Sequence, residues 1–449
     1  MAKPTLFTDD DLATFHAALD ELRAPGSYSP GRWNVSALNR RADIVGGAFP
    51  QRIILRDISL RTIEQMPGIL RSEDERLSFL RKLVSAGVPE VNTSGFLRRR
   101  TLEEMKSEVA TVKEISEACQ LVYLGPVTAE DFALTAKAGY DYVQLMSSYL
   151  GAATPVLSPP TYHRMWHQRD WRSLRFPKSP QEQIDRSVRL TRMALDHGLK
   201  VSAGMNLVSY ASERYIQDYC GAVSEAGAQE IALLDSSSSL GPEAYAHIVG
   251  TALAAAGDSR IAIHAHDMFG LAVASNVAAA RAGAVVLEVA VNGYVIGPPQ
   301  ADLAATAVAL EALYGVSTGI DLARLVDIAR TGEAFTGVPV APNYPVVGRE
   351  LFALGEADQY VEEVDVDPLL HKPYTPELVG NTRPLLITST TGPFGMWRKM
   401  EQLGIEAERE DVAPILQACW EFIMTMRRPI QDAEIAAVAR IVMRARSKN

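Results

Sequence analysis

Short, almost continuously apolar segments alternate with longer amphipathic segments from about residue 50 to residue 313. At each junction a small residue and a Gly precede an apolar run, as in SAGVPEVN, KAGYDYVQLM, DHGLKVSAGM, EAGAQEIALLD, AAGDSRIAIHAH and RAGAVVLEVAV. Gly suits the left-handed backbone position that ends a helix. Runs such as IALLD and VVLEVAV are typical of strands that are buried on both faces. The pattern therefore predicts repeated helix–strand units.

Two further apolar runs, RIILRDIS and QLVYLG, complete a set of eight predicted strands. These strands begin near residues 52, 90, 121, 142, 200, 230, 261 and 286, and a helical stretch follows each of them. Eight βα units in one domain predict an α/β fold of the (β/α)8 TIM-barrel type. An open, doubly wound parallel sheet is the alternative, but no GxGxxG turn follows the first strand.

The chain of 449 residues is longer than one ordinary domain. We predict an N-terminal helical extension over 1–44, the TIM barrel over 45–315, a linker arm over 316–378 and a C-terminal helical subdomain over 379–449. The arm is rich in Pro and Gly and has no apolar core of its own.

Composition narrows the class of protein. Hydrophobic residues make up 47% and charged residues 22%, as in soluble globular proteins. A net charge of −10 argues against nucleic acid as a partner, because phosphate binding requires a basic face. No apolar run has the length of a membrane span or the form of a signal peptide, and the three Cys residues are isolated. We expect a cytoplasmic protein with no membrane partner.

Polar side chains gather where the predicted strands end. In a TIM barrel these carboxyl ends meet at one mouth, which carries the active site. Buried strand ends would not collect so many polar groups unless they faced a shared pocket. The residues concerned are Asp57, Ser59, Arg61, Asn92, Ser94, Gln144, Asn206, Asp235, His264, His266 and Asn292.

The string HAHD at residues 264–267 is the sharpest local signal. His264 and His266 are two residues apart on a predicted strand, so both imidazoles point to the same face. Both rings could therefore bind one divalent ion, such as Mg, Mn or Zn.

Several segments resemble the pyruvate-carboxyltransferase-like superfamily of metal-dependent TIM barrels, which includes the 2-isopropylmalate, homocitrate and citramalate synthases and 3-hydroxy-3-methylglutaryl-CoA lyase. The synthases read DTTLRDGEQSPG where this chain reads DISLRTIEQMPG. Their HCHNDLGLAVANSLAA corresponds to HAHDMFGLAVASNVAA, and their VNGIGERAGNADL corresponds to VNGYVIGPPQADL. TGVPVAPNYPVVGRELFA and WRKMEQLGIE extend the similarity beyond the barrel.

The resemblance implies a divalent metal held by an Asp, two His and an Asn, and an Arg that stabilises an enolate oxygen. The Arg corresponds to Arg61 and the His pair to His264 and His266, whereas Thr62 and Gln300 stand where the Asp and the Asn are expected. The candidate catalytic residues are Arg61, Glu64, His264 and His266. The candidate substrate-binding residues are Arg56, Asp57, Thr62, Gln65, Asn92, Gln144, Asn206, Asp235, Asn292 and Gln300.

Thr62 leaves the expected metal site without its carboxylate. Two neutral imidazoles alone bind a hard ion such as Mg²⁺ weakly, because anionic oxygens supply most of the attraction. If the first strand continues through residue 61, residues 57, 59 and 61 share a face, and Asp57 could be the third ligand. Asp267 is another candidate. Without a metal, either His could act as a general base.

A long insertion, residues 147–180, separates the fourth predicted strand from its helix. It carries several Arg, His and Trp residues and reads as a surface lid or dimer contact, or as a lid over an anionic, partly apolar substrate.

The resemblance implies an acyltransferase that joins an acyl-CoA co-substrate to a small anionic substrate, a 2-oxo acid. A lyase or aldolase of the same superfamily, or a non-catalytic descendant, is the alternative. The resemblance also implies a homodimer, because in the synthases the region of the arm reaches over the partner's barrel.

Overall fold

The computed structural model describes residues 7–23, 26–93, 100–125, 128–148, 179–355 and 358–446. The chain forms two compact units. Leu38–Val340 make one unit, and Met1–Ala37 together with Ala341–Asn449 make the other. The four-part division expected from the sequence stays a prediction.

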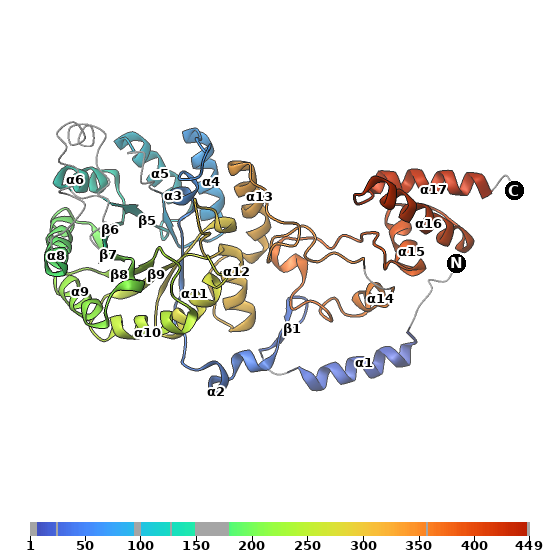
Figure 1. Cartoon of the computed structure of the whole chain (residues 1–449), viewed down its shortest axis with the longest axis horizontal. Helices are drawn as coiled ribbons and strands as arrows, with labels where there is room; N and C mark the ends of the chain where they lie inside the picture. The colour runs from blue at the N-terminus through green and yellow to red at the C-terminus, as the bar shows by residue number, and fades with distance from the viewer. Residues whose placement is uncertain are drawn as a thin grey trace. The chain divides into compact units, whose positions relative to one another are not determined.

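Eight parallel strands form a closed barrel in the first unit (Figure 1). Each strand pairs with its neighbour in sequence, and β10 closes the ring against β3, with Val286 opposite Ile54 and Val289 opposite Asp57. The predicted TIM barrel is therefore confirmed. The strands are β3 Ile54–Asp57, β4 Glu90–Asn92, β5 Gln120–Leu124, β6 Tyr142–Ser148, β7 Lys200–Asn206, β8 Glu230–Asp235, β9 Arg260–Ala265 and β10 Val286–Val289.

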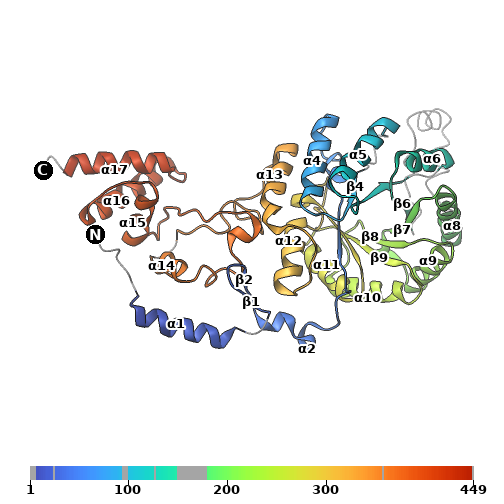
Figure 2. The same cartoon turned by 180° about the vertical axis from the view of Figure 1, so that it is seen from behind.

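Helices surround this barrel, as both views show (Figures 1 and 2). Ser72 and Thr101 begin two of them with capping boxes, in which Glu75 and Glu104 accept hydrogen bonds from the cap backbone. The helices of this unit are α2 Ala42–Val45, α3 Ser59–Ile63, α4 Glu73–Ser85, α5 Leu102–Ile115, α6 Ala129–Ala138, α8 Pro180–Asp196, α9 Glu213–Glu225, α10 Pro242–Leu253, α11 Ala272–Arg281, α12 Leu303–Val308 and α13 Leu325–Thr336.

Alternation along the strands decides which side chains enter the barrel. Ile54, Ala232, Leu234, Ala262 and Val286 pack together in its interior. On β3, β9 and β10 the next position on the same face, two residues further along, is polar: Arg56 follows Ile54, His264 follows Ala262 and Glu288 follows Val286. On these three strands the polar positions therefore lie between the apolar cluster and the carboxyl ends.

The second unit joins the two ends of the described chain. It contains α1 Asp9–Leu22, a hairpin of β1 Tyr28–Ser29 and β2 Trp33–Asn34, and the helices α14 Asp358–Val366, α15 Pro393–Gln402, α16 Arg409–Met426 and α17 Asp432–Arg446. Met396, Met400, Ile415, Cys419 and Ile435 form the centre of the core of its last three helices. No helix in the described part of the chain is both long and apolar enough to span a membrane.

Candidate active site

The mouth of the barrel is built around the carboxylate of Glu288, which is fully buried on β10. His264 Nδ1–H donates to one carboxylate oxygen at 2.7 Å, and Gln144 Nε2 donates to the other at 2.7 Å. Nη1 of Arg61 lies 3.5 Å from this carboxylate, and Nη1 of Arg56 lies 3.4 Å from it. Burial opposes ionisation, but the hydrogen bond from His264 and the charge of Arg61 hold the pKa of Glu288 below its ordinary value.

Sequence reasoning missed Glu288, although a signal was present. A single Glu in the apolar run VVLEVAV has no apolar explanation, since a charge on a strand buried on both faces requires a partner. Here the partners are an imidazole, an amide and two guanidinium groups. Glu288 thereby connects four of the residues expected in the site.

Arg61 and Asn92 meet on one amide. Nη1 of Arg61 donates to Gln144 Oε1 at 3.2 Å, and Asn92 Nδ2 donates to the same oxygen at 3.3 Å. The orientation of Gln144 is fixed because its Nε2 already donates to Glu288. Burial lowers the pKa of Arg61 from its usual value, but arginine keeps its charge in proteins. The mouth therefore holds a fixed cation beside neutral amides.

Arg61 reaches this position from a helix. The sequence predicted a strand through residue 61, with residues 57, 59 and 61 on one face, but β3 ends at Asp57 and Ser59–Ile63 form α3. Ser59 stabilises the change of direction, because Asp57 accepts hydrogen bonds from its backbone N–H and its hydroxyl. That part of the prediction was wrong.

The two imidazoles lie side by side where β9 ends. Nε2 of His264 is 3.2 Å from Nε2 of His266, and Nδ1–H of His266 donates to the carbonyl of Pro298 at 2.9 Å. Gln300 Nε2 lies 3.1 Å from His264 Nε2, 2.9 Å from His266 Nε2 and 3.2 Å from His266 Nδ1. Burial lowers the pKa of both rings, and the neighbouring His264 helps to bring the pKa of His266 to about 4. Both rings are therefore neutral near pH 7.

The donor set does not fit the Mg²⁺ or Mn²⁺ site that the resemblance implies. The Thr62 hydroxyl donates to the carbonyl of Tyr294 at 2.7 Å. Asp57 is held by Ser59, and Asp267 accepts from the backbone N–H of Ala272 at 2.8 Å. Among the described residues no third His, Cys, Asp or Glu joins the pair. The expectation that Asp57 completes a ligand set with His264 and His266 is therefore wrong.

Arg56 is paired with buried carboxylates inside the barrel. Its guanidinium binds Glu90 through Nε and Nη2, and it binds Glu230 at 2.7 and 2.6 Å. Arg260 binds the same two carboxylates. With 0% exposure and these partners, Arg56 does not have the substrate-facing position that the sequence predicted.

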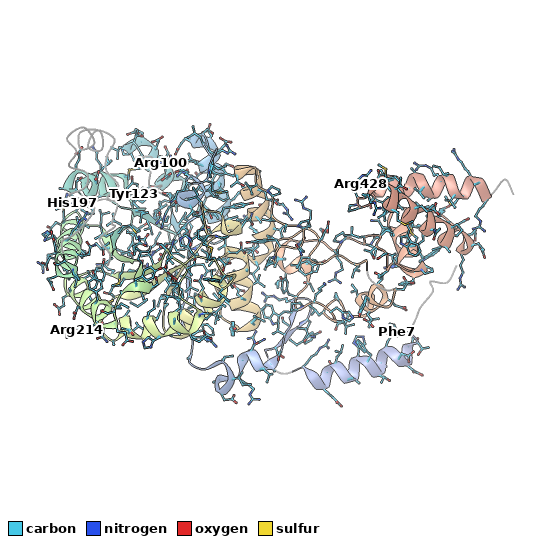
Figure 3. The ribbon with its side chains drawn as sticks, viewed as in Figure 1. Phe7, Arg100, Tyr123, His197, Arg214 and Arg428 are labelled. Carbon is cyan, nitrogen blue, oxygen red and sulfur yellow. The ribbon has the colours of Figure 1, made fainter. Side chains whose placement is uncertain are left out.

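Glu64 belongs to a second ion network, with Arg76 and Arg100. The Arg100 side chain, labelled in Figure 3, also binds Glu73 at 2.5 Å, and Arg76 binds Glu108 at 2.9 Å. This network links the end of α3 to α4 and α5. The predicted catalytic role of Glu64 stays a prediction.

The remaining predicted residues form hydrogen bonds with neighbouring parts of the protein. Asn206 accepts from Ser236, and Asp235 accepts from Ser237 and from the backbone of Leu240. Asn292 has a left-handed φ of 54° and donates to the carbonyl of Ala329 at 3.0 Å. Gln65 Nε2 is 3.5 Å from the carbonyl of Arg61. Ser94 and most of the predicted insertion, residues 149–178, lie outside the described residues.

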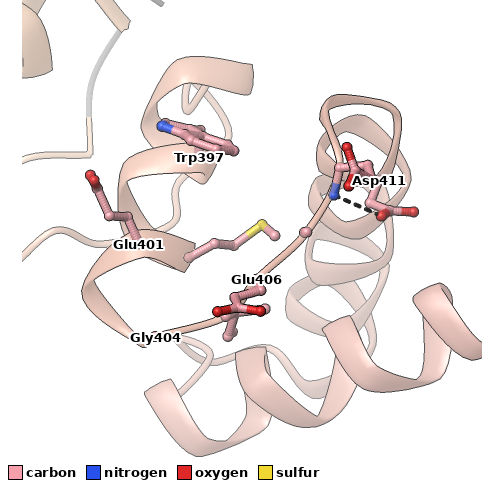
Figure 4. A pocket seen from close by; sticks show the side chains of 9 residues that line it. Trp397, Glu401, Gly404, Glu406 and Asp411 are labelled. Carbon is pink, nitrogen blue, oxygen red and sulfur yellow. Dashed lines mark hydrogen bonds between the residues drawn. The ribbon is translucent and has the colours of Figure 1, made fainter. Parts of the chain in front are cut away.

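A separate hollow of about 600 Å³ lies in the C-terminal helices (Figure 4). It is lined by Trp397, Met400, Glu401, Gly404, Ile405, Glu406, Ala407, Glu408 and Asp411. None of the residues of the barrel mouth lines this hollow.

The fold and the site together define a TIM barrel with a buried Arg, a His pair and a carboxylate at its carboxyl-terminal mouth. The HMGL-like family matches residues 168–331. The chain is 30% identical to the 2-phosphonomethylmalate synthase of Streptomyces rubellomurinus, over 81% of this chain and 91% of that protein. The chain belongs to the HMGL-like, or pyruvate carboxyltransferase, family.

Other relatives carry names of the same kind. A Methanopyrus kandleri protein with the provisional name (R)-citramalate synthase is 29% identical, over 88% of this chain and 73% of its own length. The homocitrate synthase of Methanothermobacter thermautotrophicus is 25% identical, over 86% of this chain and 92% of that protein. The solved HMG-CoA lyase of Bacillus subtilis has a TM-score of 0.52 and 18% identity, covering 65% of this chain and 96% of the lyase, and it shares the fold.

Proposed function

We propose that this protein forms a carbon–carbon bond between an acyl-CoA and a 2-oxo acid. The arrangement that supports this most directly is the convergence of Arg61 and His264 on Glu288, at 3.5 and 2.7 Å. A condensation of this type requires a base for the acyl α-carbon and a cation for the oxygen that gains charge. Members of the family that are named as synthases support the same reaction class.

The residues divide the chemistry between them. A neutral imidazole of the His pair accepts the α-proton of the thioester at its Nε2 atom, where the substrate replaces the Gln300 N–H, and the resulting carbanion attacks the 2-oxo carbon. Arg61 stabilises the carboxylate of the 2-oxo acid and the alkoxide that forms beside it, because a fixed cation in a buried site needs no reorganisation. Hydrolysis of the thioester completes the balance: acyl-CoA, 2-oxo acid and water give a 2-hydroxy diacid, CoA and a proton.

The test is thiol release from several acyl-CoA donors across a panel of 2-oxo acids. The acids carry methyl, branched alkyl, carboxyalkyl or phosphonomethyl side chains, and products are identified by mass. We expect one donor–acid pair to give stoichiometric CoA and a 2-hydroxy diacid. The proposal would be overturned if none of the donor–acid pairs released CoA. Cleavage of a 2-hydroxy acyl-CoA without condensation would instead identify a lyase.

Arg61→Ala should lower kcat/KM about 100-fold or more, the scale of one lost oxyanion-hole donor. Arg61→Lys is the matched variant, because it keeps the charge but loses the two-pronged donor, and it should fall between Ala and the parent. Circular dichroism confirms that each variant is folded. Turnover of Arg61→Ala within tenfold of the parent would remove Arg61 from the reaction.

A further inference from the structure

The imidazoles of His264 and His266 face each other through the same ring nitrogen. Glu288 and the carbonyl of Pro298 each accept a hydrogen bond from an Nδ1 atom, at 2.7 and 2.9 Å. A neutral imidazole has one N–H, so these partners assign a lone pair to both Nε2 atoms. The two Nε2 atoms are only 3.2 Å apart. Either a cation or an N–H donor must therefore lie beside both of them.

Gln300 supplies such a donor. A backbone bridge joins it to His266, and the N–H of Ala301 donates to the carbonyl of Ala265 at 3.2 Å, so the residue is held against β9. Gln300 is 2% exposed, and its Nε2 lies 3.1 Å from His264 Nε2. The same atom lies 2.9 Å from Nε2 and 3.2 Å from Nδ1 of His266, so it stands over that ring and not in line with the Nε2 lone pair. One N–H of the amide therefore suits the lone pair of His264, while the amide covers the face of His266.

The carboxylates around the imidazoles already have partners. Arg56, Arg61 and Arg260 pair with Glu90, Glu230 and Glu288. Asp235, whose charge also acts on both imidazoles, accepts hydrogen bonds from Ser237 and from the backbone N–H of Leu240. Asp57 is held by Ser59, so each of these carboxylates is engaged and a buried dication would need a further anion.

We propose that the Gln300 amide, and not a metal ion, holds the two imidazoles together. The inference rests on the proposed function only in assigning these residues to the reaction site. Binding of metal is measured without turnover, so the two proposals can fail separately. The rival arrangement turns the amide over, so that Gln300 Oε1 joins the two ring nitrogens around a cation.

Titration calorimetry with Zn²⁺ and with Mn²⁺, after dialysis against a chelator, separates the two arrangements. Unmodified protein should show no saturable binding tighter than about 100 µM. Gln300→Ala removes the amide and opens the space between two neutral imidazoles, which suit Zn²⁺, so its Zn²⁺ affinity should rise at least tenfold. Gln300→Met fills the same space without N–H groups and should bind no more tightly than the parent.

Adding His264→Ala to Gln300→Ala should abolish the gain and so locate the ion. Gln300→Ser serves as a second opening variant if thermal unfolding shows that Gln300→Ala does not fold. Tight binding by the unmodified protein that weakens in Gln300→Ala would overturn the proposal, because Gln300 would then be a ligand. Equal, weak binding by the parent and both folded opening variants would also overturn it.

Discussion

Glu288 orients the candidate base more directly than any other carboxylate among the described residues. His264 donates to one of its oxygens and Gln144 to the other, so both side chains are fixed by one carboxylate. The same charge faces Arg61. Glu288 is therefore a positioning residue that acts through His264.

Glu288→Gln should lower kcat about 100-fold, the lower range for loss of a positioned general base, with little change in KM for the acyl-CoA. The neutral amide of the variant has only one acceptor oxygen and no charge, so it cannot both accept from His264 Nδ1–H and pair with the guanidinium groups of Arg61 and Arg56. Glu230→Gln is the matched control, because Glu230 is equally buried and binds Arg56 but does not contact His264. Both variants should lose stability, but only Glu288→Gln should lose kcat. Equal loss of kcat in both would contradict the assignment.

The buried hydroxyl of Thr62 allows a test of the missing carboxylate. Its side chain is 1% exposed, and its hydroxyl donates to the carbonyl of Tyr294 at 2.7 Å. Thr62→Asp replaces that donor with a carboxylate that faces an acceptor, which should cost about 2–4 kcal/mol of unfolding free energy. A dication would then compensate the carboxylate, so Mn²⁺ should raise the melting temperature of Thr62→Asp but not of Thr62→Ser. A variant as stable as the parent without metal would be the contrary result.

Elements of the barrel could be predicted well because their signals are local. The Gly residues at the six junctions, Gly87, Gly139, Gly198, Gly227, Gly257 and Gly283, all have positive φ, as a left-handed helix end requires. The short helix α3 could not be predicted, because five residues are too few to show helical periodicity. Contacts of Arg56, Glu64 and Asn292 with distant partners were equally invisible in the sequence.

The N-terminus of helix α12 is capped by a buried carboxylate, that of Asp302. Asp302 caps it by accepting from the N–H of Ala305 at 2.7 Å, and burial raises the pKa of Asp302 to about 7. The native state therefore keeps a proton between pH 3.8 and 7 that the unfolded state releases, so stability falls as pH rises through this window. Asp302→Asn keeps the cap oxygen without the ionisation.

Chemical unfolding of Asp302→Asn and of the parent should give similar free energies at pH 4. The variant should be more stable by about 2–4 kcal/mol at pH 8, the order of a three-unit pKa shift. Asp321→Asn, at the exposed start of a short 3₁₀ helix, is the control and should show no such divergence. A constant difference across the pH range would argue against the raised pKa.

At the scale of the whole molecule, the two ends of the chain share one compact unit, which the sequence did not predict. Residues 1–44 read as a separate extension, since no local pattern reports pairing across more than 300 residues. Arg23 binds Asp367 at 2.5 Å, Asn34 N–H donates to Pro373 at 2.9 Å, and Thr375 N–H donates to Arg32 at 3.0 Å. The homodimer expected from the resemblance stays a prediction.

Removal of residues 1–37 should therefore loosen the C-terminal helices and leave the barrel unchanged. The deletion breaks the backbone bonds to residues 373 and 375, each of which contributes about 1 kcal/mol, and the Arg23–Asp367 pair, which is mostly buried. Barrel strands keep all their partners, because β3 pairs with β4 and β10 within residues 38–340. Hydrogen-exchange mass spectrometry should show faster exchange in peptides from 358–446 and unchanged exchange in the barrel. Arg23→Ala keeps the backbone bonds and should have a smaller effect in the same peptides. Faster exchange in the barrel strands, or none in 358–446, would show that the N-terminal segment stabilises a different part of the chain.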